Sequence, residues 1–255
     1  MAMKVYAMTG GATGIGAALR QQLADAGHRV ISVDIREGDI IADLSTAAGR
    51  ETALTGVREL AADGLDGFIA CAGLPPVAPV QLIASVNYFA AVEMAAGLKD
   101  LVGMRRGTVL LVASNSAPMI ENDHPFVQSC LAADEQATLA SLADLNGQSV
   151  YAGSKRALTV WMRRNVVAWA KAGVRLNAVA PGITLTPLTA QVFADPELGD
   201  VMRQFGESVP WGEAAQPGQI ANVMRFMLSE EADFVCGSVF FVDGGSDAML
   251  RSDQF

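Results

Sequence analysis

The chain has 255 residues and a formal net charge of −9 at pH 7, and 51% of its residues are hydrophobic. This length suits one large α/β domain, and the acidic balance argues against nucleic acid or an anionic membrane as partner, since both bind through basic patches. The start lacks a charged and apolar leader and no run of 18 apolar residues appears, so we expect a cytoplasmic protein.

The first part of the chain reads as a strand, a glycine-rich turn and a helix. Residues 4–8 form a short apolar run, and Thr9–Gly16 (TGGATGIG) leads from it into an apolar-periodic helix. Gly10, Gly14 and Gly16 let the backbone turn sharply and approach a pyrophosphate closely. The helix N-terminus supplies N–H donors for that anion, so the pattern indicates a dinucleotide site.

A second strand, residues 29–33, ends in Asp34. An acidic side chain at this strand end binds ribose hydroxyls and repels a 2′-phosphate, which favours NAD over NADP. Arg36, two residues further on, leaves NADP open, and a solvated strand end is the alternative for Asp34.

Apolar runs of this kind recur along the chain and alternate with helical stretches. The alternation predicts a single Rossmann-type α/β domain over residues 1–255, a doubly wound parallel sheet with helices on both faces. The predicted strands cover residues 4–8, 29–33, 66–71, 108–113, 174–179 and 238–242.

Tyr151 and Lys155 are four residues apart, so on a helix they lie on one face, one turn from each other. A free tyrosine has a pKa of about 10, and a cation fixed beside it lowers that pKa toward the working range. Such pairs also arise by chance on surface helices. The glycine-rich turn and Asp34 favour the interpretation as an acid–base pair.

Further short motifs follow in a fixed order. They are Ala70-Cys71-Ala72-Gly73, Val86-Asn87-Tyr88, Ser114 after a strand, Pro181-Gly182 with Thr184 and Thr186, and Asp243-Gly244-Gly245. Together with the glycine-rich turn, Asp34 and the Tyr151–Lys155 pair, they resemble the short-chain dehydrogenase/reductase family over nearly the whole chain. Several stretches, among them Ser85–Phe89 and the terminal Gln254-Phe255, are similar to bacterial 3α-hydroxysteroid dehydrogenase/carbonyl reductases.

The resemblance implies hydride transfer between NAD and a carbonyl carbon. Tyr151 would take or return the hydroxyl proton, Lys155 would hold the nicotinamide ribose, and Ser114 would stabilise charge on the oxygen. Asn87, the fourth implied catalytic residue, would hold a water that links Lys155 to solvent. The residues expected to bind NAD are Gly10, Thr13, Gly14, Ile15, Gly16, Asp34, Ile35, Asp43, Leu44, Ala72, Gly73, Tyr151, Lys155, Pro181, Gly182, Thr184 and Thr186.

Two features depart from the family pattern. The strand signature NNAG is reduced to ACAG, so Cys71 must be accommodated by packing. Ser114 and Tyr151 are also further apart than usual, and the helical periodicity of the excess predicts an inserted helical segment over about 117–147. Because this segment enters directly before the helix that the family commonly uses to form tetramers, we expect a homodimer, with a homotetramer as the alternative.

Residues 185–214 are unusually apolar and are expected to form a substrate lid, or two short helices packed on the body. The residues expected to line the substrate pocket are Ser116, Leu188, Phe193, Met202 and Phe205. The segment carries one arginine, Arg203, and no lysine, so an anionic substrate such as an acyl-CoA is not expected.

The expected substrate is a bulky apolar cyclic secondary alcohol or its ketone: a steroid, or a smaller alicyclic such as a monoterpene alcohol. Two alternatives stay open, an NAD(H)-binding redox-sensing protein without turnover and an NADPH-dependent reductase of a keto-thioester. The three cysteines, Cys71, Cys130 and Cys236, are widely spaced and the two histidines lack suitably spaced ligand-type neighbours, so buried thiols in a reducing compartment and no metal site are expected.

Overall fold

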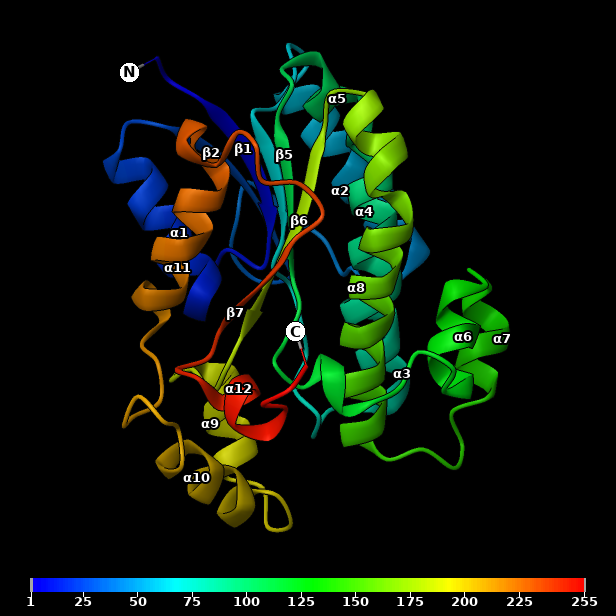
Figure 1. Cartoon of the computed structure of the whole chain (residues 1–255). Helices are drawn as coiled ribbons and strands as arrows, with labels where there is room; N and C mark the ends of the chain where they lie inside the picture. Colours follow the sequence, from blue (N-terminus) through cyan, green and yellow to red (C-terminus); the bar gives the residue numbers. More distant parts are fainter. Residues whose placement is uncertain (1, 255) are drawn as a thin grey trace.

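A seven-stranded parallel sheet forms the centre of the computed structural model, which describes residues 2–254 (Figure 1). The strand order is β3-β2-β1-β4-β5-β6-β7. The strands are β1 (Val5–Thr9), β2 (Arg29–Asp34), β3 (Ile40–Ile41), β4 (Gly67–Ala70), β5 (Thr108–Val112), β6 (Arg175–Pro181) and β7 (Val239–Val242). The predicted fold class is confirmed. The apolar runs do not predict β3, because two residues are too short to form a pattern.

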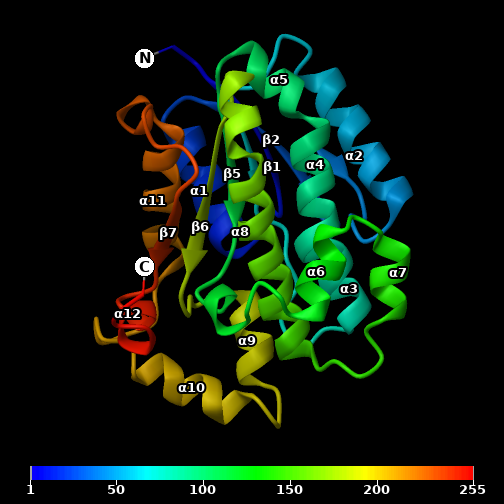
Figure 2. The same ribbon diagram turned by 45° about the vertical axis from the view of Figure 1, so that its right-hand side comes forward.

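Helices cover both faces of this sheet. In Figures 1 and 2, α1 and α11 lie on one face, and α2, α4 and α8 lie on the other. The α-helices are α1 (Gly14–Asp25), α2 (Ala47–Leu60), α3 (Val80–Ala84), α4 (Ala91–Gly97), α5 (Lys99–Met104), α6 (Pro125–Leu131), α7 (Glu135–Ala140), α8 (Gly147–Lys171), α9 (Pro187–Phe193), α10 (Gly199–Glu207), α11 (Pro217–Leu228) and α12 (Ser246–Leu250). Shorter turns are the π-helix η1 (Ser85–Ala90) and the 3₁₀ helices η2 (Ala117–Met119) and η3 (Glu230–Ala232).

The central strands are buried on both faces, which explains their uninterrupted apolar sequences. Successive side chains of a strand point to opposite faces, so Phe68 packs into the core below α4 and α8, while Ile69 packs into the core below α1 and α11. Val109 and Leu110 of β5 divide in the same way. The sheet is therefore held between two apolar layers.

One helical run is apolar enough to need separate comment. Residues Val80–Gly97, through α3, η1 and α4, have a mean hydropathy of 1.2 over 18 residues, which is long and apolar enough to cross a membrane by length and composition alone. Ile83 and Met94 of this run are fully buried in the core of the domain. The run therefore packs as a core helix.

Segment 117–147 contains η2, α6 and α7 and lies against α8 and η1 (Figure 2). Its apolar residues Phe126, Val127 and Leu142 are buried and belong to the same core cluster as Leu158 of α8. Gly153 of α8 makes this approach possible, because a Cβ at that position would lie 2.5 Å from the Phe126 ring. The segment thus buries these apolar side chains on its own chain, while Met119 stays exposed.

Candidate active site

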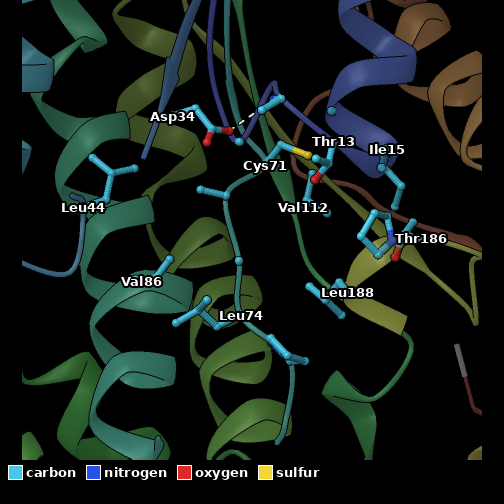
Figure 3. A pocket seen from close by; sticks show the side chains of 18 of the residues that line it. Thr13, Ile15, Asp34, Leu44, Cys71, Leu74, Val86, Val112, Thr186 and Leu188 are labelled. Carbon is cyan, nitrogen blue, oxygen red and sulfur yellow. Dashed lines mark hydrogen bonds between the residues drawn. The ribbon is translucent and has the colours of Figure 1, made fainter. Parts of the chain in front are cut away.

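The carboxyl ends of the parallel strands open onto one cavity of about 580 Å³ (Figure 3). Ligands of open α/β sheets bind at this edge, where the strand order reverses between β1 and β4. Every residue that the sequence predicts for cofactor binding lines the cavity, as do Ser114, Tyr151 and Lys155. Asn87 is not among the lining residues within the described chain.

The glycine-rich turn between β1 and α1 is too crowded for side chains. Gly10 and Gly14 have positive φ angles of 71° and 56°. A Cβ at Gly16 would lie 1.9 Å from the Gly10 carbonyl oxygen, and one at Gly10 would lie 2.7 Å from the Ala72 backbone. The glycines thus let the N-terminus of α1 sit directly at the cavity edge, where its N–H groups face an anion.

Asp34 is fixed at the end of β2 by the turn beside it. Its Oδ2 accepts a hydrogen bond from Ala12 N at 3.1 Å (Figure 3), and its Oδ1 accepts one from Arg36 N at 3.3 Å. Further along the cavity, Asp43 Oδ1 accepts from Ser45 N and Oγ. Two carboxylates therefore stand along this end of the cavity.

Tyr151 and Lys155 lie near the start of α8, on one face, as their spacing predicts. Asn146 caps this helix, accepting a hydrogen bond from Ser149 N. Lys155 Nζ is 5.9 Å from the Tyr151 ring centroid and donates to the Val112 carbonyl oxygen at 2.8 Å. The ammonium group is thus held between the tyrosine and the end of β5.

Ser114 follows β5 directly, and Ser116 orients its hydroxyl. Ser116 N and Oγ lie 3.1 and 3.0 Å from Ser114 Oγ and donate to it. With its oxygen accepting both bonds, the Ser114 hydroxyl donates its own hydrogen, on the side of Tyr151 and the cavity. Ser116, predicted as a substrate contact, is not among the lining residues of the described chain, and its hydroxyl is bonded to Ser114.

Burial sets the acid–base properties of the pair. It raises the pKa of the Tyr151 hydroxyl, and a hydrogen bond with Ser114 offsets part of that rise. It lowers the pKa of the Lys155 ammonium to about 8. The expectation that Lys155 brings the tyrosine pKa below its ordinary value is wrong for the protein's own groups, because loss of water outweighs the favourable contacts.

Asn87 lies in η1 and uses its amide to hold the backbone of Leu74. Its Oδ1 accepts from Leu74 N at 2.7 Å, and its Nδ2 donates to Leu74 O at 3.0 Å. A Cβ at Gly73 would lie 3.3 Å from Asn87 Oδ1 and 3.7 Å from Lys155 Nζ, so glycine brings these groups together. Asn87 thus positions a residue of the cavity wall, and its water-holding role stays a prediction.

Thr9 joins the central strands next to the weakened ACAG signature. Its Oγ1 accepts hydrogen bonds from Cys71 N at 3.2 Å and Ala72 N at 3.1 Å. The Cys71 thiol lines the cavity and burial raises its pKa to about 11, so it is neutral at pH 7. Thr9 thus holds the backbone of two lining residues, Cys71 and Ala72, and only its place at the start of the TGGATGIG turn indicates this role.

At the other end of the cavity, α9 contributes Leu188, the one predicted substrate-pocket residue that lines it (Figure 3). Within residues 2–254, Phe193, Met202 and Phe205 do not line the cavity; they are half-buried on α9 and α10. The sequence pattern shows which face of each short helix is apolar. It does not show whether that face points into the cavity.

Segment 185–214, which contains both helices, is closed at its base. Leu185 N donates to Ala215 O at 2.8 Å, and Ala215 N donates to Ile183 O at 2.9 Å. A parallel bridge pairs Thr184 with Ala215. The two ends of the segment are therefore joined directly beside the cavity.

Other lining residues are not among those that the sequence predicts for the site, although Ala12, Cys71 and Val86 stand inside its motifs. They are Ala12, Val33, Arg36, Ala42, Ser45, Cys71, Leu74, Pro75, Leu82, Val86, Val112, Ala113, Pro187, Thr189 and Gln191. Most lie within two residues of a predicted site residue, so strand ends and turns carry them into the wall. Within residues 2–254, no group of three or more His, Cys, Asp or Glu side chains is arranged for a metal ion.

Taken together, the cavity holds a buried tyrosine hydroxyl, a serine hydroxyl free to donate and an ammonium group. These groups can move a proton to or from an oxygen atom and stabilise charge on it. The glycine-rich turn and Asp34 offer a site for a dinucleotide along the same wall.

Comparisons with known proteins agree with this geometry. A family profile described as enoyl-(acyl carrier protein) reductase matches residues 10–247. The 3-alpha-hydroxysteroid dehydrogenase/carbonyl reductase of Comamonas testosteroni is 40% identical over 259 residues, covering 99% of this chain and 100% of that protein. The cis-4-hydroxycyclohexanecarboxylate dehydrogenase of Sinomonas cyclohexanicum is 31% identical, covering 97% and 98%.

A solved structure is also similar over its full length. The crystal structure of the 3-alpha-hydroxysteroid dehydrogenase from Pseudomonas sp. B-0831 complexed with NADH superposes with a TM-score of 0.95 at 42% identity, covering 98% of this chain and 100% of that one. The profile match, the full-length relatives and the order of the site residues lead to one conclusion: the chain belongs to the short-chain dehydrogenase/reductase family.

Proposed function

We propose that the protein is an NAD(H)-dependent oxidoreductase that interconverts a bulky, apolar cyclic secondary alcohol and its ketone. The observation that carries the proposal is that Ser114, Tyr151 and Lys155 line the same cavity as the glycine-rich turn and Asp34. Relatives named for a hydroxysteroid and a hydroxycyclohexane carboxylate support a cyclic substrate. A steroid and a smaller alicyclic, such as a monoterpene alcohol, both fit this class.

The residues of the cavity suit NAD. Gly10, Gly14 and the N-terminus of α1 leave space and N–H donors for a pyrophosphate, and the Asp34 carboxylate would accept hydrogen bonds from ribose hydroxyls. Leu44 and Asp43 would flank the adenine. The segment from Pro181 to Thr186 would contact the nicotinamide. When bound, NAD supplies the acceptor for the hydride that leaves the alcohol carbon.

The side chains of this chain handle the proton and the charge. In oxidation, the deprotonated Tyr151 oxygen takes the alcohol proton, and in reduction it returns that proton to the ketone oxygen. Ser114 donates a hydrogen bond to the same oxygen, because Ser116 already occupies its acceptor side. Lys155 keeps positive charge beside the phenolate.

The test is a screen of alcohols with NAD and with NADP, followed by the absorbance of the reduced nicotinamide. The panel contains a 3α-hydroxysteroid, a monoterpene alcohol, cyclohexanol and a linear secondary alcohol. We expect turnover with NAD and a cyclic alcohol and little with the linear one. Tight NADH binding without turnover of any alcohol would instead favour the redox-sensing alternative.

The keto-thioester alternative has less support. Arg203, the one arginine of segment 185–214, donates to the Phe193 carbonyl and pairs with Asp200, so its charge is engaged within the segment. Asp34 also stands where a 2′-phosphate would lie. Turnover of an acyl thioester with NADPH at a rate above that of every cyclic alcohol would favour this alternative.

The proposal includes a cytoplasmic homodimer. Its support is that segment 117–147 covers the outer side of α8 and buries Phe126 and Val127 there, which leaves that helix face unavailable to a second copy. The three cysteines are free, which suits a reducing compartment, although the expectation of buried thiols is wrong for Cys236, which is exposed. Light scattering at micromolar concentration tests the assembly: with a 26.7 kDa chain, a mass near four subunits would contradict it.

A further inference from the structure

Three helices meet at one buried arginine. Arg50 of α2 has a side chain that is only 4% exposed, and its Nη1 and Nη2 donate to both carboxylate oxygens of Glu135 on α7, at 3.3 and 2.5 Å. Its Nε lies 2.7 Å from Glu93 Oε2 of α4 but outside hydrogen-bonding geometry. The Glu135 contact is therefore the directional one, and it ties segment 117–147 to the body of the domain.

The same guanidinium reaches the wall of the cavity. Arg50 Nη1 also donates to the Leu44 carbonyl oxygen at 3.3 Å, in a buried hydrogen bond. Leu44 is buried and lines the cavity next to Asp43 and Ser45. A continuous set of contacts thus runs from Glu135 through Arg50 to the loop of residues 43–45.

The rest of this loop is held from the first turn of α2. Thr46 N and Oγ1 donate to the Asp43 carbonyl oxygen, and Thr46 Oγ1 accepts from Gly49 N. These bonds fix the two ends of the loop, and the Arg50 bond fixes Leu44 between them. The position of Leu44 then depends on where the guanidinium is held.

We propose that Arg50 and Glu135 are positioning residues through which segment 117–147 sets the adenine end of the cofactor cavity. The inference rests on the proposed function, because it assigns that end to the adenine half of NAD. Without the Glu135 charge, Arg50 is left with Glu93, whose side chain is 44% exposed compared with 25% for Glu135. The guanidinium then turns toward Glu93 and leaves the Leu44 carbonyl.

The experiment compares the two halves of the cofactor in wild type and in Glu135→Gln. Calorimetry measures the Kd of ADP-ribose, which contains the adenine half, and kinetics measure kcat/KM with nicotinamide mononucleotide, which lacks it. We expect the Kd of ADP-ribose to rise about three- to tenfold, as for a lost charge-assisted hydrogen bond. Nicotinamide mononucleotide turnover and kcat at saturating NAD should stay unchanged, since Tyr151 and Ser114 lie at the other end of the cavity.

Two further variants separate positioning from stability. Asp100→Asn breaks another bidentate pair made by α2, with Arg58, at an exposed place outside the cavity, and should leave ADP-ribose affinity unchanged. The double variant Arg50→Met with Glu135→Leu replaces the pair by apolar side chains, which commonly keeps a domain folded. It should lose ADP-ribose affinity as Glu135→Gln does.

The outcomes are distinct. Two results would overturn the positioning role while leaving the proposed function in place. The first is that Glu135→Gln weakens ADP-ribose binding and nicotinamide mononucleotide turnover equally. The second is that ADP-ribose affinity is unchanged in both the single and the double variant. A wild-type protein that binds neither NADH nor ADP-ribose would overturn the proposed function and this inference with it.

Discussion

At the cofactor end of the cavity the residues follow directly from strands of the sheet, whereas at the other end, where we propose that the substrate binds, they come from the short helix α9. Asp34 and the glycine-rich turn are fixed by backbone hydrogen bonds and close contacts with β1, β2 and β4. On the substrate side, Val201 is 60% exposed and Trp211 80% exposed. The cofactor end is thus a rigid product of the fold, and the substrate end is a weakly packed addition to it.

The largest expected effect lies where the two ends meet. Tyr151→Phe should lower kcat by about 10²–10⁴-fold and leave NADH affinity nearly intact, because the hydroxyl acts only in proton transfer. Steady-state kinetics and NADH fluorescence titration measure the two quantities. Tyr6→Phe, a buried tyrosine of β1 outside the cavity, is the matched control. A Tyr151→Phe variant that keeps more than about a tenth of the rate would contradict the acid–base role.

A change at the cofactor end should alter nucleotide choice and leave alcohol preference unaffected. Asp34→Ala removes the carboxylate that repels a 2′-phosphate, so the ratio of kcat/KM for NAD over NADP should fall by about tenfold or more. Asp25→Ala at the end of α1 should leave that ratio unchanged. Equal kcat/KM for both nucleotides in the wild type would show that Asp34 does not select.

The pH dependence follows from the burial of Tyr151 and Lys155. Because the pKa of Tyr151 is raised, its hydroxyl keeps its proton at neutral pH, which serves ketone reduction. Alcohol oxidation needs that proton removed, so its kcat should increase from pH 7 to 9, by up to about tenfold per pH unit at first and less steeply above about pH 8, where Lys155 loses the charge that supports the phenolate. Reduction should decrease over the same range. The opposite slopes would show that another group carries the proton.

The smallest effect should come from the substrate end. Leu188→Ala should raise KM for a bulky cyclic alcohol by about tenfold, because it removes apolar contact from the cavity wall. Met202→Ala on α10 should change KM much less, since Met202 does not line the cavity among the described residues. NADH affinity should stay the same in both variants. A larger effect from Met202 would mean that α10 closes over the substrate during turnover.

The same contrast explains what the sequence predicts and what it does not. Strands such as β4 and β5 are apolar runs, so the fold can be inferred from them. The glycine-rich turn is too crowded for side chains, so its glycines reveal where the cofactor wall lies. Strand β3 has only two residues, and the π-helix around Asn87 has no sequence pattern that distinguishes it from an α-helix.

Side-chain partners are harder to infer than elements. Ser116 is bonded to Ser114, and Asn87 is bonded to the Leu74 backbone. Both partners are set by which atoms the fold brings close, so residue type alone does not identify them. The sequence shows that Phe193 and Met202 lie on apolar helix faces. What those faces contact depends on how α9 and α10 are oriented on the domain, which the pattern does not show. The direction of the Tyr151 pKa depends on the depth of burial, which sequence spacing does not contain.

The joined base of segment 185–214 has a consequence for how such enzymes diversify. Leu185 and Ala215 are hydrogen-bonded to each other, so the chain leaves the sheet and returns at almost the same point. Thr186, Leu188 and Gln191 of this segment line the cavity, so only the part that follows Gln191 can be replaced without changing the cofactor wall. Under the proposed function, substrate range can then change by exchange of residues 192–214, while the cofactor contacts up to Thr186 are kept.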